Sequence, residues 1–399
     1  MIAKFPRLLV ATEFPPNASG GGAAVVRQML KDWPAENLFW WSCSPDTDNR
    51  FGQKVQRHWC ATIPRKFYPH RRWTSLKSVF LERVWSPWAT RHLKLTLEEL
   101  RPDTVWVIPH NWSIPPLARA LGERWPNYHV TMQDYVDVHN NPRRFGRERC
   151  ARMAAMADRL YVGAVTRDAT SFPMIADLRA RTGKDAAQML HAGLEAADMD
   201  FLEQQRPRES TAIRIAYAGT ILVEDVFELF ASAVESIRGT TFKPVELHLF
   251  GSHSYCRRRW FKQRWMFEHG NLSESALLVK LREYDWAFAP MALTDHDPRY
   301  NRFSFPTKFI TYLSAGLPIT TLGHPESSVM KMAVRYDVGL TTSTRDLNTL
   351  SEQLRVALND PSPWNHHGKE IIRCARTEFD AEKMRRTLYE CFQKCAAKG

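Results

Sequence analysis

A loop, a short helix and a buried strand are predicted in that order over residues 305–320, and this order constrains the fold more than any other stretch. Pro306 and Lys308 lie where the loop meets the helix. Gly316 suits the helix C-terminus, and residues 317–321 read as a buried strand. A lysine at a helix N-terminus favours an anion such as phosphate, because free N–H groups and the helix dipole add to its charge. On local chemistry alone, an ordinary loop–helix–strand step of an α/β sheet is the simpler interpretation.

Chain length and cysteine usage limit the class of protein. The 399 residues predict two or three domains, and an apolar content of 44% suffices for their cores. No apolar run is long enough to span a bilayer, and the N-terminus lacks a signal-peptide layout. Seven scattered cysteines without a C-x-x-C pair argue for reduced thiols and against a disulfide framework or a zinc site. We therefore expect a cytoplasmic protein.

Net charge and tryptophan content indicate which partners the chain could take. The formal net charge of +12 favours phosphate-bearing partners: nucleic acid, anionic lipid or a nucleotide. Several of the 14 tryptophans adjoin Arg or Lys, as in residues 71–73, 83–85 and 257–262. This pattern is typical of a bilayer interface and also suits stacking on single-stranded nucleic acid. No RRM, KH or helix-turn-helix pattern is present, so we expect no nucleic-acid partner.

Strand and helix patterns alternate in both halves of the chain. In the first half, a glycine-rich turn over 19–22 follows the first of four predicted strands, which cover 7–12, 104–109, 128–132 and 159–162. Each ends in polar residues, and open α/β sheets bind ligands at that edge. Residues 199–212 are polar and predict an interdomain linker, after which the alternation restarts at Ile213. Residues 366–398 have a long helical pattern.

Five motifs in order carry a resemblance to a known family. The stretch over 305–320 is similar to F-P-S-K-x-x-E-Y-x-A-A-G-x-P-[IV], and the other four motifs cover 213–220, 247–252, 269–290 and 336–340. Together they resemble the donor domain of sugar-nucleotide-dependent glycosyltransferases with the GT-B fold, closest to the retaining family that includes glycogen and sucrose synthases. The resemblance is strong over 205–345 and weaker over 1–205.

The resemblance implies an α/β fold of the GT-B type, with two doubly wound Rossmann-like domains facing across a cleft. An acceptor-side domain would cover 1–200 and be joined by a C-terminal helix over 375–399, and the donor domain would cover 212–374. The implied donor-binding residues are Gly21, Gly22, Gly219, Thr220, Gly251, Phe305, Pro306, Thr307, Lys308, Phe309 and Thr311. Lys308 and nearby helical N–H groups would hold the diphosphate. For Gly219 or Gly251 taken singly, a tight turn is an equally good interpretation.

The sequence departs from the family pattern in two places. The family has two glutamates seven residues apart, the second of which binds ribose hydroxyls, but Phe303 and Thr311 stand at those positions. The family also tends to place Arg and Lys after the turn at Gly219, where residues 221–225 contain no basic side chain. Candidate replacements are Asp295 and Asp297 for the ribose contact, and Arg257, Arg258, Arg299 and Arg302 for the phosphate clamp. For residues 257–259, a solvated or lipid-facing charge run is the simpler interpretation.

The candidate catalytic residues, His110 and Asp134, follow strands of the first domain. The resemblance implies that His110 lies near the reacting sugar and contacts its hydroxyls, although a lone histidine is more often structural. Asp134 could orient His110 or the acceptor hydroxyl, and an Asx turn is an equally good interpretation. Gly20 to Gly22 would let the main chain approach the donor phosphates or the transferred sugar.

These features predict a hexosyltransferase-type glycosyltransferase that moves a sugar from a nucleotide-sugar donor to a glycan, lipid-linked or part of a surface polysaccharide. The resemblance implies retention of configuration without metal or cofactor, and the chain has no D-x-D motif. Positive charge at Lys308 would stabilise the departing diphosphate. Because the family's glutamates and basic residues are missing, the main alternative is a catalytically silent GT-B protein that binds a glycan or a protein. A sugar-nucleotide 2-epimerase ranks below both.

An amphipathic pattern over 66–95 predicts contact with a membrane surface. Trp73, Leu76, Phe80 and Val84 share one helical face, with basic residues close by. The alternative interpretation is a helix that packs this apolar face on the domain core. We expect reversible association with anionic liposomes at the inner face of the membrane, reduced by Arg71→Glu combined with Arg72→Glu.

Overall fold

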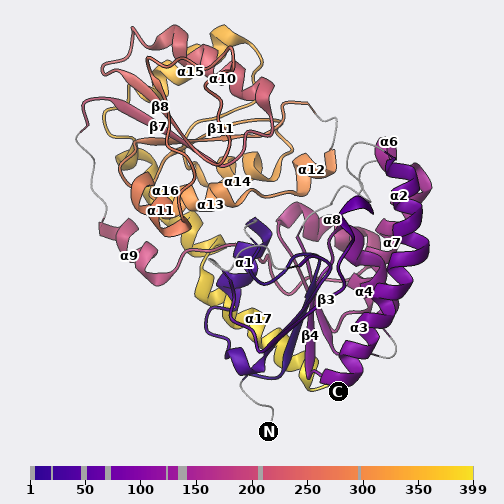
Figure 1. Ribbon diagram of the computed structural model, residues 1–399. Helices are drawn as coiled ribbons and strands as arrows, with labels where there is room; N and C mark the ends of the chain where they lie inside the picture. Colours follow the sequence, from indigo (N-terminus) through magenta and orange to yellow (C-terminus); the bar gives the residue numbers. More distant parts are fainter. Residues whose placement is uncertain are drawn as a thin grey trace. The chain divides into compact units, whose positions relative to one another are not determined.

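The structure of the protein is a computed structural model that describes residues 5–18, 21–45, 52–67, 73–122, 125–133, 142–204, 210–294 and 298–398. The chain divides into two compact units (Figure 1). The first unit consists of Met1–Ala192 together with Ala381–Gly399, and the second of Gly193–Asp380.

Each unit is built on a six-stranded parallel sheet. In the first, the order is β3-β2-β1-β4-β5-β6, and the strands are β1 (Leu8–Thr12), β2 (Leu38–Ser42), β3 (Arg57–Cys60), β4 (Thr104–Ile108), β5 (Tyr128–Met132) and β6 (Thr166–Ala169). In the second, the order is β12-β11-β10-β7-β8-β9, and the strands are β7 (Ile213–Ala218), β8 (Val245–Phe250), β9 (Met266–Glu268), β10 (Trp286–Pro290), β11 (Ile319–Leu322) and β12 (Thr341–Thr342). The order of each sheet runs outward in both directions from its first strand, so the predicted α/β class with two doubly wound sheets is confirmed.

Helices surround the first sheet, whose central strands are buried along their whole length. These helices are α1 (Gly21–Met29), α2 (Thr74–Phe80), α3 (Ser86–Leu100), α4 (Ile114–Ala120), α6 (Pro142–Phe145), α7 (Arg147–Gly163), α8 (Phe172–Thr182) and α17 (Ala381–Ala396), with short 3-10 turns over Ala35–Asn37, Arg65–Phe67 and Asn111–Ser113. A π-helical turn over Leu81–Trp85 joins α2 to α3, so residues 74–100 form one continuous helix. In the described part of the chain, no helix combines the length and the apolar character that a bilayer crossing requires.

The last helix, α17, completes the core of the first unit. It packs on β4, β5, β6 and α1 (Figure 1). Phe392 is fully buried there, with ring centroids 5.5 Å from Trp33, 5.4 Å from Trp106 and 5.6 Å from His129. A segment from the end of the chain is therefore part of the same core as the first strands.

The second unit has its own core, to which α10 contributes strongly. Its helices are α9 (Ala196–Gln204), α10 (Glu224–Ile237), α11 (Glu274–Leu281), α12 (Pro298–Phe303), α13 (Thr307–Ser314), α14 (Ser328–Tyr336), α15 (Leu347–Leu358) and α16 (Pro363–Glu378). Phe227 and Phe230 of α10 are fully buried, and the Phe230 ring stacks on Phe288 of β10 with centroids 3.7 Å apart. This helix shows the three- and four-residue spacing of buried apolar residues typical of a core-facing amphipathic helix.

Three segments differ from the pattern that the sequence predicts. The strand predicted over 159–162 is wrong: these residues end α7, whose buried face recurs at helical spacing and includes Leu160 and Tyr161. Short apolar runs do not distinguish a strand from a buried helix, and the strand of this region is β6. The predicted linker over 199–212 begins inside α9, which packs on α16. The helical pattern over 366–398 divides into α16 and α17 around Phe379, whose carbonyl accepts from the Leu194 N–H at 2.6 Å.

We expect Phe392→Ala to lower the free energy of unfolding of the first unit by about 3–5 kcal/mol, because it removes a buried ring between three others. Chemical denaturation followed by circular dichroism measures this change. Phe242→Ala, at a ring that is 51% exposed, is the matched control and should cost below about 1 kcal/mol. Equal losses in the two variants would contradict the role given to α17.

Candidate functional site

Two glycines bring the carboxyl ends of β7 and β8 together in the second unit. Gly219 has φ +102°, a left-handed conformation that favours glycine, and its N–H donates to Phe250 O at 2.7 Å. A Cβ at Gly251 would lie 2.9 Å from Gly219 O, so a side chain there would push the two turns apart. Both glycines are therefore required by the geometry of tight turns. The turns also leave backbone exposed at the edge where open α/β sheets bind ligands.

The Lys308 ammonium lies beside this pair of turns. Its Nζ donates to Tyr217 Oη at 2.8 Å, lies 4.3 Å from the centre of that ring, and would be 3.8 Å from a Cβ built at Gly219. Tyr217 Oη in turn donates to Thr220 O at 2.7 Å. The side chain keeps partial exposure, yet the surrounding protein lowers the pKa of Lys308 to about 8 by desolvation.

An anion would compensate the charge on Lys308. Within the described residues no carboxylate lies within ion-pair distance of its Nζ. Lys308 is the second residue of α13, so its backbone N–H lies in the first turn, where the helix dipole also favours negative charge. The structure thus brings together four predicted donor residues: Gly219, Thr220, Gly251 and Lys308.

Other residues of the 305–320 segment hold α13 in place. Phe305 and Phe309 are buried, with ring centroids 5.4 Å apart, and the Phe309 N–H donates to Pro306 O at 3.1 Å. Thr311 Oγ1 donates to Thr307 O at 3.2 Å within the helix. These contacts position the Lys308 backbone.

Some of the residues proposed to replace the missing family contacts lie outside the described residues. Asp295 and Asp297 lie outside the described residues, as does the side chain of Arg299. Arg258 pairs with Glu224 at 3.2 Å, and residues 257–259 are exposed. Sequence reasoning missed Tyr217, the direct partner of Lys308. Its position two residues before Gly219, at the end of a strand, is the feature that could have indicated it.

A buried carboxylate holds His110 at the corresponding edge of the first sheet. His110 follows β4 and Glu13 follows the neighbouring strand β1, and their Nδ1 and Oε2 atoms are 2.7 Å apart. The Glu13 side chain is only 6% exposed and that of His110 is 30% exposed. Ser113 fixes the backbone of His110 from both sides, since Oγ accepts from the His110 N–H and donates to its carbonyl. Sequence reasoning missed Glu13, although a glutamate directly after a buried strand is a detectable feature.

The glycine turn after β1 meets the end of β5. Gly21 and Gly22 begin α1, and a Cβ at Gly22 would lie 2.5 Å from Gln133 Oε1. The Gln133 side chain donates from Nε2 to Gly22 O at 3.3 Å. A side chain at position 22 would therefore require the flexible end of Gln133, the residue after β5, to move. Gly20 and Asp134, two further predicted site residues, lie outside the described residues.

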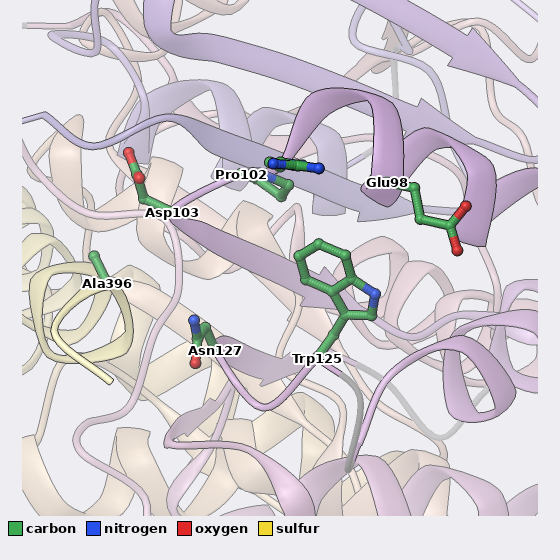
Figure 2. Close-up of a pocket in the computed structure, with 7 residues that line it drawn as sticks. Glu98, Pro102, Asp103, Trp125, Asn127 and Ala396 are labelled. Carbon is green, nitrogen blue, oxygen red and sulfur yellow. The ribbon is translucent and has the colours of Figure 1, made fainter. Parts of the chain in front are cut away.

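Two cavities lie at other places on the units. One of about 380 Å³ is lined by Arg101, Trp125 and Asn127, among others, at the end of the first sheet where β4 and β5 begin (Figure 2). The other, of about 560 Å³, lies between α11 and the ends of β8 and β9, and includes Phe250, next to Gly251. Neither is lined by Lys308 or His110. In the described ranges, no cluster of three or more His, Cys, Asp or Glu side chains could hold a metal ion.

Comparison with known proteins establishes the fold. No family model and no curated protein sequence match the chain. A sucrose-phosphate synthase from Thermosynechococcus elongatus has TM-score 0.65 and 14% identity, over 98% of this chain and 100% of that one. A UDP-forming α,α-trehalose-phosphate synthase from Burkholderia xenovorans, in complex with glucose-6-phosphate, has TM-score 0.64 and 13% identity, over 97% and 100%. Anabaena HepE in complex with UDP has TM-score 0.63 and 13% identity, over 96% and 98%.

These similar structures are GT-B glycosyltransferases, and the resemblance expected from the sequence motifs is confirmed at the level of the fold. At such low identity the similarity concerns the path of the chain and not its chemistry. The roles of individual residues in the two clusters therefore remain predictions.

The lowered pKa of Lys308 predicts a pH-dependent stability difference. Between about pH 8 and its ordinary value of 10.5, the unfolded chain holds a proton that the folded protein has released. Lys308 therefore disfavours folding below pH 8, and this cost fades as pH rises through the window. Lys308→Met removes this cost, so the variant should have a higher free energy of unfolding than the wild type at pH 7. The difference should fall by about 1–2 kcal/mol from pH 7 to pH 10, as chemical denaturation measures.

Lys308→Arg is the control, because the guanidinium stays charged over the whole range. It should be the least stable of the three proteins at pH 10. A constant difference between wild type and Lys308→Met from pH 7 to pH 10 would contradict the lowered pKa.

Proposed function

We propose that the protein is a glycosyltransferase that moves a sugar from a nucleotide-sugar donor to a glycan or lipid-linked glycan. The observation that carries the proposal is the Lys308 ammonium, which lies beside Gly219 at the sheet edge with no carboxylate partner among the described residues. An anionic group of the size of a diphosphate suits this charge and the N–H groups of α13. The fold supports the same class of reaction, since two of the similar structures carry UDP in their names.

In this proposal, Lys308 acts on the leaving group. Breaking the bond between sugar and diphosphate develops negative charge on the phosphate oxygens, and a positioned ammonium stabilises that charge more in the transition state than in the substrate. Retention of configuration and independence from metal ions are part of the proposal. The family resemblance supports both.

His110 would act on the sugar. The Glu13 carboxylate accepts from Nδ1, which sets the orientation of the imidazole and stabilises any positive charge on it. A ring held in this way can contact a sugar hydroxyl with a fixed geometry. Glu13 is a positioning residue in this scheme.

A catalytically silent GT-B protein that binds a glycan or a protein is the second candidate. Phe303 is half-buried at the end of α12 and Thr311 donates to its own helix, so neither supplies the carboxylate that binds ribose in the family. Nucleotide binding separates the two candidates.

Calorimetry with UDP and a panel of UDP-, GDP-, ADP- and TDP-sugars, with EDTA in the buffer, tests the donor site. We expect binding of at least one donor, weakened by about 1.5–3 kcal/mol in Lys308→Ala because a charge-assisted hydrogen bond is lost. Lys243→Ala, which removes a lysine shortly before the first residue of β8 and so at the opposite end of that strand from Gly251, is the matched control and should bind like the wild type. A folded protein without affinity for any nucleotide would favour the silent alternative.

His110→Ala should lower kcat for transfer on the order of 100-fold while nucleotide affinity stays unchanged, because His110 belongs to the first unit and contacts the sugar. Glu13→Gln keeps the size of the side chain but loses its charge, and should lower kcat by roughly tenfold. His58→Ala is the control and should leave kcat unchanged. His58 lies on the edge strand β3, where its ring is hydrogen-bonded to Ser42 of β2. If transfer by His110→Ala equals that of the wild type, His110 has no role in catalysis.

A further inference from the structure

The helix over 74–100 has two apolar faces, and one of them is exposed. Its buried face, which includes Leu81, Leu93 and Leu97, packs on the rest of the first unit. On the other side lies a second row, which we call the exposed row: Trp73 (70% exposed), Leu76 (64%), Val84 (56%), Trp88 (49%) and Leu95 (54%). Trp73 is the N-cap residue that precedes the helix, and Val84 lies within the π-helical turn. Val84, Trp88 and Leu95 are four and seven residues apart, a spacing that keeps them on one side of the helix.

The side chains of the exposed row do not pack on the core of the first unit. Of the face predicted from the sequence, only Phe80 is substantially covered, and it stacks on Phe67 with ring centroids 3.8 Å apart. Trp73 and Trp88 are the two tryptophans of the described residues that are exposed by more than a third. Large apolar side chains gathered on one side of a helix mark an interaction surface, whereas scattered ones do not.

Basic residues flank the exposed row. Arg83 and Arg91 are exposed and Lys94 is half-exposed, and none of the three pairs with an acidic side chain among the described residues. The acidic residue in the middle of the helix, Glu82, is neutralised by Arg149 at 3.0 Å and Arg152 at 3.3 Å. The surface around the row therefore carries more positive than negative charge, with Glu98 as an exposed acidic residue near its C-terminal end.

We propose that the exposed row docks the protein on the surface of an anionic lipid bilayer. The row from Trp73 to Leu95 extends for about 33 Å at the rise of an α-helix, so the helix would lie flat in the interface with its aromatic and aliphatic side chains among the headgroups. Tryptophan beside arginine suits that environment, and the positive charge complements anionic lipids.

A second copy of the chain fits the same surface less well. A two-fold dimer would bring the row of one molecule against that of its partner. Arg83 and Arg91 of both copies would then meet within an apolar interface without a carboxylate between them, which is unfavourable. The bilayer supplies negative charge at its surface, and this complementarity decides between the two occupants.

Docking on a bilayer would bring the protein to a lipid-linked acceptor. In this one respect the inference rests on the proposed function. Binding to lipid can be measured without donor or acceptor. Failure of vesicle binding and failure of nucleotide binding are therefore separate results.

Co-sedimentation with vesicles of neutral lipid, alone or mixed with an anionic lipid, tests the charge contribution. We expect binding to the anionic vesicles at low ionic strength and loss of binding as salt is raised, because exposed charges are screened. Arg83→Glu with Arg91→Glu should weaken binding at least about tenfold. Lys243→Glu with Lys369→Glu makes the same change of charge in the second unit and should bind like the wild type. Circular dichroism and calorimetry with UDP verify that each variant is folded.

Quenching of tryptophan fluorescence by lipids brominated in their acyl chains tests the apolar contribution. Trp73 and Trp88 should be quenched in the bound protein, and Trp73→Phe with Trp88→Phe should remove most of the quenching while much of the binding remains. Three results would overturn the proposal: no binding to anionic vesicles at low salt, wild-type binding by the double glutamate variant, or a dimer in sedimentation that Leu76→Ser with Trp88→Ser dissociates.

Discussion

The candidate donor site of the second unit is built on one close approach of two turns at the sheet edge. Gly219 adopts a left-handed conformation and Gly251 lacks a Cβ, so the turns after β7 and β8 pack backbone against backbone. This arrangement opens room beside them for the ammonium of Lys308, which is held by the hydroxyl of Tyr217. Desolvation of an ammonium without a carboxylate is unfavourable, and the lowered pKa of Lys308 reflects that cost. A protein that keeps such a group has a site whose electrostatics improve when an anion binds.

Both units place polar groups at the same edge of a parallel sheet, but the groups differ in their chemistry. In each, polar side chains collect where the strands end, because the carboxyl ends of parallel strands share one edge. In the second unit that edge presents a cation and backbone N–H groups. In the first, a buried carboxylate orients the imidazole of His110, and Gly22 packs closely on Gln133. In the proposed function, the edge in the second unit serves the anionic leaving group and the edge in the first unit serves the hydroxyls of the sugar.

The helix over 74–100 shows how one element can serve both stability and interaction. One row of its side chains is part of the core of the first unit, and the opposite row is apolar yet exposed. An ordinary surface helix is polar on its outer side, and the departure from that pattern is what points to a partner. Because arginines flank the outer row, the partner must be compatible with positive charge.

The sequence by itself determined the α/β class, the repetition of strand and helix in two halves, and the positions of strands such as β1, β4, β5 and β11, because buried parallel strands are short apolar runs that end in polar residues. It did not indicate β2 or β3. It did indicate Lys308, Gly219 and Gly251, each from a local motif, and the family resemblance linked the three motifs to one site. It could not place residues 159–162, whose apolar run fits a strand and a helix equally well, and only packing against the unit's core made them helical. The pairs Glu13–His110 and Tyr217–Lys308 join residues 97 and 91 positions apart, so they exist only once the strands are adjacent. The sequence likewise showed an apolar face over 73–84 but not its surroundings. Only the tertiary structure decided that a different row is buried, because a helix with two apolar faces can turn just one of them toward the core.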